Sequence, residues 1–172
     1  MAFIRCTAKL LKDLGVKPTN IPDQPLDLFD WHANMLRLDR KKYVLFTNSQ
    51  ALFSFLMRWA GKPKSTEFQE QFRLKLFQSL MSEGIAEEHI EYMLGGHKQV
   101  TITKTNSRSV LGSMNDLAFQ AKYMVYVSGR IDDADLQEIN RKLNQNPMSV
   151  IKYQNGTTEL KRRLDEMHKW RR

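Results

Sequence analysis

Apolar and polar residues follow two different patterns along this chain. In the first part, short apolar runs at residues 32–38, 43–46 and 51–57 are separated by polar clusters. Short apolar runs that are rich in aromatic residues and bounded by polar turns are typical of β-strands. Further along, apolar residues recur every three or four positions, which is the spacing of helices with one buried face. The pattern therefore predicts a strand-rich segment over residues 1–59 and a helix-rich segment over residues 65–172.

The start of the chain predicts a strand followed by a short helix. Residues 3–6 have the composition of a strand, and Thr7 can cap a helix over residues 8–14 because its hydroxyl can accept a free backbone N–H. Gly15 is placed to end that helix in a left-handed conformation. The proline-rich residues 17–30 then predict the longest loop of the chain.

A β-hairpin is predicted next, because the apolar runs 32–38 and 43–46 flank a charged turn at residues 39–42. The run at residues 51–57 leaves two alternatives, a third strand or a short helix capped by Asn48. We favour the strand because aromatic residues are dense there.

The second part, after a break at residues 61–64, predicts helices with one further strand at residues 100–103. Each predicted helix has an apolar stripe and a polar residue that can cap its start. For the last helix, that cap is Thr157 or Thr158. The predicted helices cover residues 65–82, 86–94, 107–126, 132–144 and 157–172.

Together these elements predict one α+β domain over residues 1–172. A small antiparallel sheet would pack with several helices, and the C-terminal half would be helical. The length of 172 residues fits a single domain with an adequate core.

Composition narrows the class of protein. Cys6 is the single cysteine, which excludes an internal disulfide and favours a reducing, cytoplasmic location. The first residues lack a basic segment followed by a long apolar run, so no signal peptide is expected. No run of about 18 apolar residues occurs, so no membrane association is expected.

The net charge of +8 is concentrated at the C-terminus. Residues 161–172 contain six basic and two acidic side chains, which is half of the net charge. One interpretation is a solvated helix end, where cations are favoured by the helix dipole. The other is binding to nucleic-acid phosphates. The candidate residues for that contact are Lys161, Arg162, Arg163, Arg171 and Arg172.

Common catalytic and ligand-binding motifs are absent. The four histidines, His32, His89, His97 and His168, do not have the spacing of a common zinc site, so no metal site is predicted. The sequence contains no glycine-rich phosphate loop and no nucleophile elbow. We therefore expect no cofactor.

Two polar stretches, residues 31–42 and 104–116, are less easily explained by packing alone. The second begins a predicted helix at whose N-terminus free N–H groups, with nearby cations, would favour an anion. Gly112 in the middle of that helix costs about 1 kcal/mol relative to alanine, which close packing or a ligand would have to offset. The candidate binding residues are Asn34, Arg40, Lys104, Asn106, Arg108 and Asn115, and the candidate proton-transfer residues are His32 and Asp116.

The same stretches carry a resemblance to a protein family. Together with the opening Phe3-Ile4-Arg5-Cys6-Thr7 and the following Lys9-Leu10-Leu11, residues 31–48 and 104–116 resemble a family of mostly bacterial proteins that is defined only as a domain of unknown function. The resemblance implies a bacterial or archaeal cytoplasmic protein and no particular activity.

Three functional hypotheses remain open. We favour a non-enzymatic binding or regulatory module, because no catalytic constellation is recognisable. The first alternative is nucleic-acid binding through the basic C-terminal helix. The second is a small enzyme acting on a phosphate- or nucleotide-containing substrate, with the two polar stretches meeting in one pocket. Possible partners are therefore nucleic acid or an anionic ligand.

Overall fold

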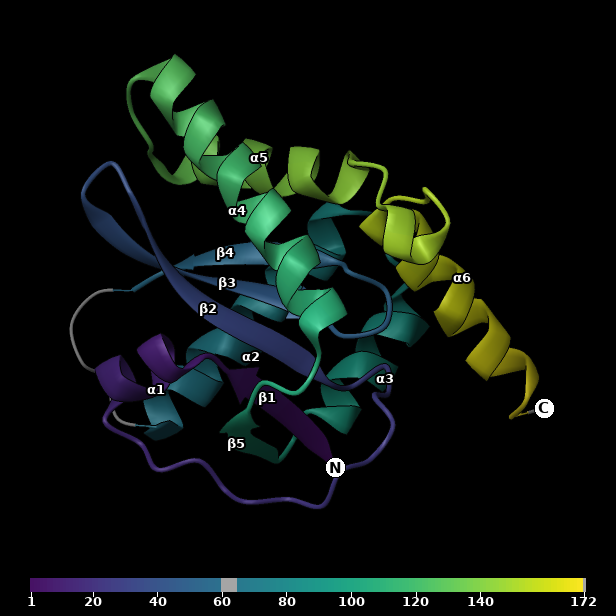
Figure 1. Cartoon of the computed structure of the whole chain (residues 1–172). Coiled ribbons are helices and arrows are strands. Elements are labelled where there is room, and N and C mark those ends of the chain that lie inside the picture. The colour runs from purple at the N-terminus through teal and green to yellow at the C-terminus, as the bar shows by residue number, and fades with distance from the viewer. Residues whose placement is uncertain (60–64, 172) are drawn as a thin grey trace.

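Five strands form one sheet in the order β4-β3-β2-β1-β5 in the computed structural model, which describes residues 1–59 and 65–171 (Figure 1). β2, β3 and β4 pair antiparallel, whereas β1 pairs in parallel with both β2 and β5. The α+β class is confirmed, but the sheet is mixed rather than purely antiparallel. α1 and a long loop join β1 to β2, and α2 and α3 lead from β4 to β5, because parallel neighbours cannot be joined by a tight turn. The strands are β1 (Ala2–Cys6), β2 (Trp31–Leu38), β3 (Lys41–Asn48), β4 (Ser54–Arg58) and β5 (Val100–Lys104).

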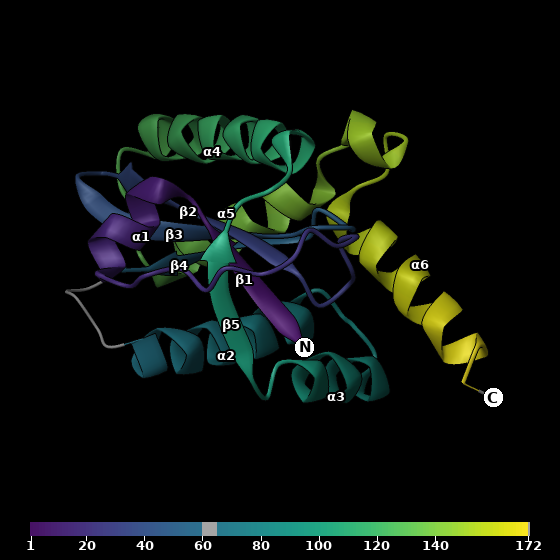
Figure 2. The ribbon, with the colours of Figure 1, turned by 60° about the horizontal axis from the view of Figure 1, so that its bottom comes forward.

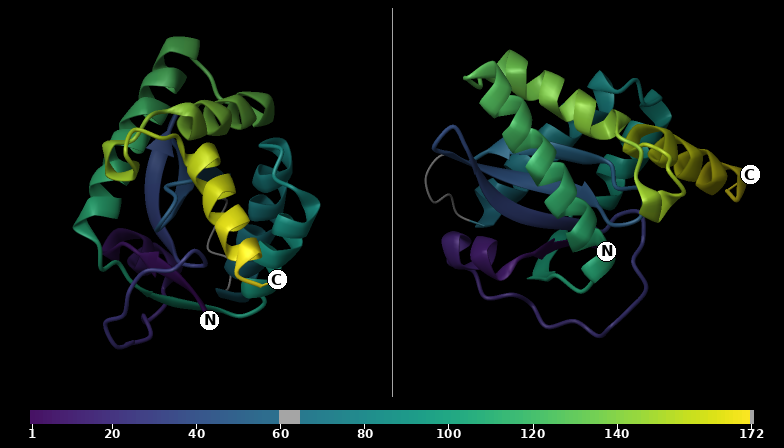
Figure 3. Two further views of the ribbon diagram at one scale, coloured as in Figure 1. Left: turned by 90° about the vertical axis from the view of Figure 1, so that its right-hand side faces the viewer. Right: turned by 45° about the horizontal axis from the view of Figure 1, so that its top comes forward.

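Helices cover both faces of the sheet. Figure 2 shows α4 on one side and the pair α2 and α3 on the other. In the left view of Figure 3, α6 lies between α4 and that pair. The helices are α1 (Ala8–Leu14), α2 (Ser65–Ser82), α3 (Glu87–Gly96), α4 (Arg108–Ser128), α5 (Asp133–Gln145) and α6 (Gly156–Lys169), with a short 3₁₀ helix, η1 (Ser149–Ile151).

Two apolar clusters fill the space between helices and sheet. The cluster on one face packs α1, α2, α3 and α6 around aromatic side chains such as Trp31, Phe46 and Phe72. The cluster on the other face packs α4 and α5 on strand residues such as Leu36 and Leu45. These residues alternate along β2 and β3, so one sequence pattern supplies both faces.

Most helix starts and ends follow from local chemistry. The Thr7 side chain accepts a hydrogen bond from the backbone N of Leu10, and Gly15 ends α1 with a φ of 66°. These contacts confirm the predicted first helix. The last helix differs from the prediction, because Asn155 caps α6 rather than Thr157 or Thr158.

The turns of the sheet also have specific conformations. Asp39 and Arg40 join β2 to β3 and both have a positive φ, the geometry of a two-residue turn that matches the strand twist. The favoured strand at residues 51–57 begins only at Ser54. Before it, the Asn48 side chain accepts hydrogen bonds from the backbone N atoms of Gln50 and Ala51. Asn48 therefore stabilises a turn and not the alternative helix.

The free edge of β4 is covered by side chains of α5. Asn140 Oδ1 accepts from the backbone N of Leu56 at 2.8 Å. Asn144 accepts from the backbone N of Ser54 at 2.7 Å and donates to the Ser54 carbonyl at 2.8 Å. An exposed strand edge is a template for pairing with other chains, and these two amides occupy the groups that such pairing would use.

Close packing does not explain the glycine at position 112 in the middle of α4. It is exposed, and a Cβ built at this position would have no heavy atom outside its own helix turn within 4 Å. Gly112→Ala is therefore expected to raise the free energy of unfolding by about 1 kcal/mol, because alanine loses less backbone entropy on forming a helix. Urea denaturation of the purified variant measures this change.

Gly156, at the start of α6, is closely packed, unlike Gly112, and therefore serves as the comparison. A Cβ there would lie 2.9 Å from the Cα of Phe53 and 3.0 Å from the carbonyl oxygen of Leu52. Gly156→Ala is expected to lower the free energy of unfolding by about 1–3 kcal/mol, because backbone atoms must shift to relieve the overlap. Equal effects of the two substitutions would contradict this interpretation of both glycines.

Candidate functional site

The structure divides the predicted site residues between two cavities. Lys104 and Asn106 line a cleft of about 520 Å³ between the loop at residues 18–23 and the end of β5, which we call the loop cleft. Arg108 and Asp116 instead line a shallow cavity of about 690 Å³ between α4 and the η1 region. The expected anion site at the start of α4 is thus split by the direction in which α4 leaves the sheet.

The remaining candidates line neither cavity. His32 is fully buried within the sheet, and Asn34 accepts a hydrogen bond from the Thr7 hydroxyl at 2.8 Å. Arg40 is exposed at the tip of the β2–β3 turn, and Asn115 is exposed on α4. The two polar stretches therefore do not bring all their predicted side chains into one of these pockets.

A row of buried polar side chains crosses the sheet instead. The strand register pairs Thr103 with Arg5, Arg5 with His32, His32 with Thr47, and Thr47 with Ser54. Residues directly opposite on neighbouring strands point to the same face, so the five side chains form one line. All five are less than 5% exposed. We call this line the polar row.

Arg5 is the charged member of the polar row and was not a candidate from the sequence. Its guanidinium donates to Asp30 Oδ2 at 3.1 Å, and both side chains are 2% exposed. Burial, together with the charge of Asp27, raises the pKa of Asp30, while the hydrogen bond from Arg5 lowers it. This ion pair fastens the end of the loop over residues 17–30 to the sheet.

Hydrogen bonding around Arg5 is incomplete. Among the described residues, Arg5 Nε, Asp30 Oδ1 and His32 Nε2 are buried polar atoms without a hydrogen-bond partner. Such atoms are rare in folded proteins because their desolvation is not repaid. Arg73 Nε is the fourth such atom in the described residues, so three of the four lie on neighbouring side chains around Arg5.

His32 is neutral at pH 7. Burial, with a smaller contribution from the charge of Arg5, lowers the pKa of His32 to about 4. Its Nδ1 lies 2.8 Å from the hydroxyl of Ser49, which fixes the ring. A neutral, buried imidazole beside a guanidinium can exchange hydrogen bonds but does not add positive charge.

The loop cleft opens beside this region. Arg5 and Thr103 lie on its wall, and the loop is held to β5 by hydrogen bonds from the backbone N of Thr19 to the Ile102 carbonyl and from the Thr103 hydroxyl to the Thr19 carbonyl. The cleft lies at the carboxyl ends of the parallel strands β1 and β5, where α/β sheets usually bind ligands. Its lining contains two cations, Arg5 and Lys104, and one carboxylate, Asp23, and the charge of Arg5 is balanced by its ion pair with Asp30.

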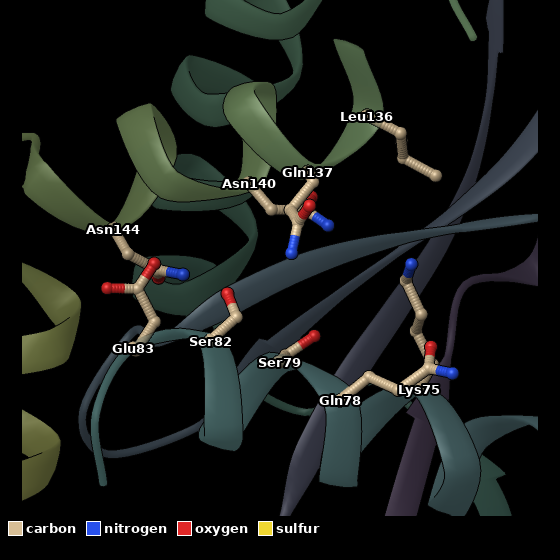
Figure 4. Close-up of a pocket in the computed structure, with 9 residues that line it drawn as sticks. All are labelled: Lys75, Gln78, Ser79, Ser82, Glu83, Leu136, Gln137, Asn140 and Asn144. Atoms are coloured by element: carbon tan, nitrogen blue, oxygen red, sulfur yellow. The ribbon is translucent and has the colours of Figure 1, made fainter. Parts of the chain in front are cut away.

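A second cleft, between α2 and α5, has a different character. Figure 4 shows Asn140 and Asn144 of α5 facing Ser79, Ser82 and Glu83 across a cavity of about 370 Å³. The side chains of both asparagines already form hydrogen bonds with the backbone of β4. Burial raises the pKa of Glu83, and its carboxylate accepts a hydrogen bond from the Thr157 hydroxyl at 3.0 Å. We interpret these polar groups as supports for the sheet edge.

The C-terminal cations are largely engaged within the chain. Arg162 forms ion pairs with Glu159 and Glu166, and Arg163 pairs with Glu159 as well. The guanidinium of Arg171 lies 4.3 Å from the ring centroid of Tyr92. Arg172 falls outside the described residues, and Lys161 is exposed.

Comparison with known proteins identifies the family. The family model of the domain of unknown function DUF6933 matches residues 3–159. The chain belongs to this family. The match includes Arg5, the loop cleft and the polar row, and it ends before the second half of α6. This confirms the resemblance to a family that is defined only as a domain of unknown function.

Further comparisons add little to the family assignment. A search of curated proteins finds no match to the chain. Within residues 1–59 and 65–171, none of the helices has the length and apolar character needed to cross a bilayer.

Proposed function

We propose that this protein is a non-enzymatic binding module that holds a small anion, a carboxylate or a phosphate, in the loop cleft. Arg5 carries the proposal, because it is a buried cation on the wall of the cleft, where its ion pair with Asp30 uses one carboxylate oxygen. A charged group in a site sheltered from water attracts an anion more strongly than the same group on an open surface. Lys104 adds a second, exposed cation at the rim.

The size and position of the cleft support a small ligand. A volume of about 520 Å³ falls in the range of small-molecule sites. The rim offers the side chains of Lys104, Thr105 and Asn106, next to the N-terminus of α4. Guanidinium groups bind carboxylates and phosphates through parallel hydrogen bonds, which favours these two classes of anion.

A titration followed by amide NMR tests this proposal. With inorganic phosphate or acetate at constant ionic strength, the amide signals of residues 18–23 and 103–106 are expected to shift in a saturable way. Lys104→Gln is expected to weaken phosphate binding about tenfold, which corresponds to about 1.4 kcal/mol. Arg5→Lys is expected to weaken it too, because lysine keeps the charge but lacks the planar fork.

Lys98→Gln is the matched control, because Lys98 is also exposed but precedes β5 and lies outside the cleft. It is expected to leave binding unchanged. An equal loss of phosphate affinity in the Lys98 and Lys104 variants would show that the effect comes from the net charge of the protein and not from the loop cleft. Shifts spread over the whole surface would reject the loop cleft as the site.

The alternatives are less well supported by the contacts. Nucleic-acid binding would have to compete with the ion pairs of Arg162 and Arg163, and it predicts an affinity that falls steeply with salt. Fluorescence polarisation with duplex DNA at two salt concentrations tests it.

An enzyme that used His32 and Asp116 would need to bring together a fully buried imidazole ring and an exposed carboxylate that lines the cavity between α4 and η1. A cytoplasmic, bacterial setting forms part of our proposal and is consistent with the buried, free thiol of Cys6.

A further inference from the structure

Two histidines that are distant in sequence meet between α3 and α6. His89 lies in the first turns of α3, and His168 lies near the end of α6. Their rings are 5.8 Å apart between centroids. Glu88 joins them, and one potential ligand atom from each of the three residues lies within 4.8 Å of the other two.

The distances leave room for an ion. Glu88 Oε2 lies 3.7 Å from His168 Nε2, and Asp165 Oδ1 lies 3.8 Å from His89 Nε2. Both separations are too long for a hydrogen bond. They are close to the roughly 3.3 Å that separates two ligand atoms bound to one tetrahedral ion at about 2.0–2.1 Å.

We propose that Glu88, His89 and His168 form a binding site for Zn²⁺ or a similar divalent transition-metal ion. Two imidazoles and one carboxylate make a ligand set that suits zinc, whereas Ca²⁺ and Mg²⁺ prefer oxygen ligands alone. Asp165 shares a face of α6 with His168 and can complete or orient the set. The neighbouring cavity of about 410 Å³ gives solvent access to the site.

The side chains can close on an ion with little cost to the fold. The Glu88 and His168 side chains are 61% and 40% exposed, so they can move by the small distance that coordination requires. His89 is 9% exposed and supplies a fixed ligand. The nearby cation, Arg171, stacks over Tyr92. Its charge is opposed by the carboxylates of Glu88, Glu91 and Asp165 around the same cavity or its edge.

Binding would fasten the end of α6 to α3. The other contacts between these helix ends include the Tyr92 hydroxyl at 3.9 Å from the Met167 sulfur and the Arg171–Tyr92 stack. A metal bridge would add a cross-link that is stable only while the ion is bound. The family match ends at residue 159, so membership of the family does not by itself imply the site.

The experiment uses the full-length, tag-free protein after treatment with a chelator. Calorimetric titration with Zn²⁺ is expected to give one site per chain, and Co²⁺ is expected to give the visible absorption of a tetrahedral nitrogen–oxygen site. His168→Ala and Glu88→Gln are each expected to lower Zn²⁺ affinity at least about tenfold, since even loss of an outer partner typically costs that much. Zn²⁺ is also expected to slow proteolysis after Lys169 in the unmodified protein.

Glu87→Gln is the matched control, because Glu87 is the exposed neighbour of Glu88 in the first turn of α3 and is not part of the cluster. It is expected to leave affinity unchanged. Zn²⁺ affinity that is the same in the His168 variant and the unmodified protein would overturn the proposal, as would tighter binding of Ca²⁺ than of Zn²⁺. His168 is partly exposed, so the folded state of its variant can be checked by circular dichroism.

Discussion

Asn144→Ala is expected to lower the free energy of unfolding by about 2–5 kcal/mol, because it removes two hydrogen bonds and leaves two buried backbone groups without a partner. Asn144 is 1% exposed, and its amide contacts both the N–H and the carbonyl of Ser54, which is fully buried. Asn140→Ala should lower the free energy of unfolding by less, because it removes a single hydrogen bond, from the backbone N of Leu56. Urea denaturation followed by circular dichroism measures both effects.

Gln145→Ala provides the control for this experiment, since Gln145 is the exposed residue that follows Asn144 on α5. Its effect should stay within about 0.5 kcal/mol. The double variant of Asn140 and Asn144 should also aggregate more readily, because it uncovers the edge of β4. A cost for Asn144→Ala no larger than that for Gln145→Ala would show that α5 does not protect the edge in this way.

Acidification from pH 7 to pH 4 is expected to cost about 3 kcal/mol of stability through His32. The pKa of His32 is about 4 in the folded chain and has its ordinary value of 6.5 in the unfolded chain. As the pH falls from 6.5 to about 4, His32 therefore binds a proton in the unfolded state but stays neutral in the folded state. Each unit of difference is worth about 1.4 kcal/mol. The stability is fully present above pH 6.5 and is lost across this window.

Denaturation at several pH values, with His32→Asn beside the unmodified protein, isolates this contribution. Asparagine can keep the hydrogen bond to Ser49 but does not titrate. The variant should therefore have a flatter profile below pH 6.5. The lowered pKa of His97 changes stability in the same direction in both proteins, so it cancels in the comparison. Parallel profiles would show that His32 is not held neutral in the sheet.

The site was harder to predict than the elements that carry it. Lys104 and Asn106 were expected near an anion and line the loop cleft. Arg5 was missed because it lies within a short apolar strand and its neighbours in space are distant in sequence. A charged residue inside a predicted strand was the signal that could have indicated it, since a buried charge needs a partner.

Helix caps, turns and apolar stripes were determined by the sequence itself, because each depends on residues within a few positions of one another. Thr7 and Gly15 mark the ends of the predicted first helix, and the structure confirms them. Ser107 and Asp132 cap α4 and α5 in the same local way. Asn155 shows the limit of such local signals, since its side chain caps α6 although two threonines that could cap a helix follow within three residues.

Only the tertiary structure decided how these elements meet. The parallel pairing of β1 with β2 and β5 aligns the polar row, although no local pattern relates Thr103 to Arg5 or His32. The packing of α6 beside α3 brings His168 to His89. Strand register and helix packing minimise the free energy of the whole core, so contacts between distant residues follow from the complete fold rather than from any one segment.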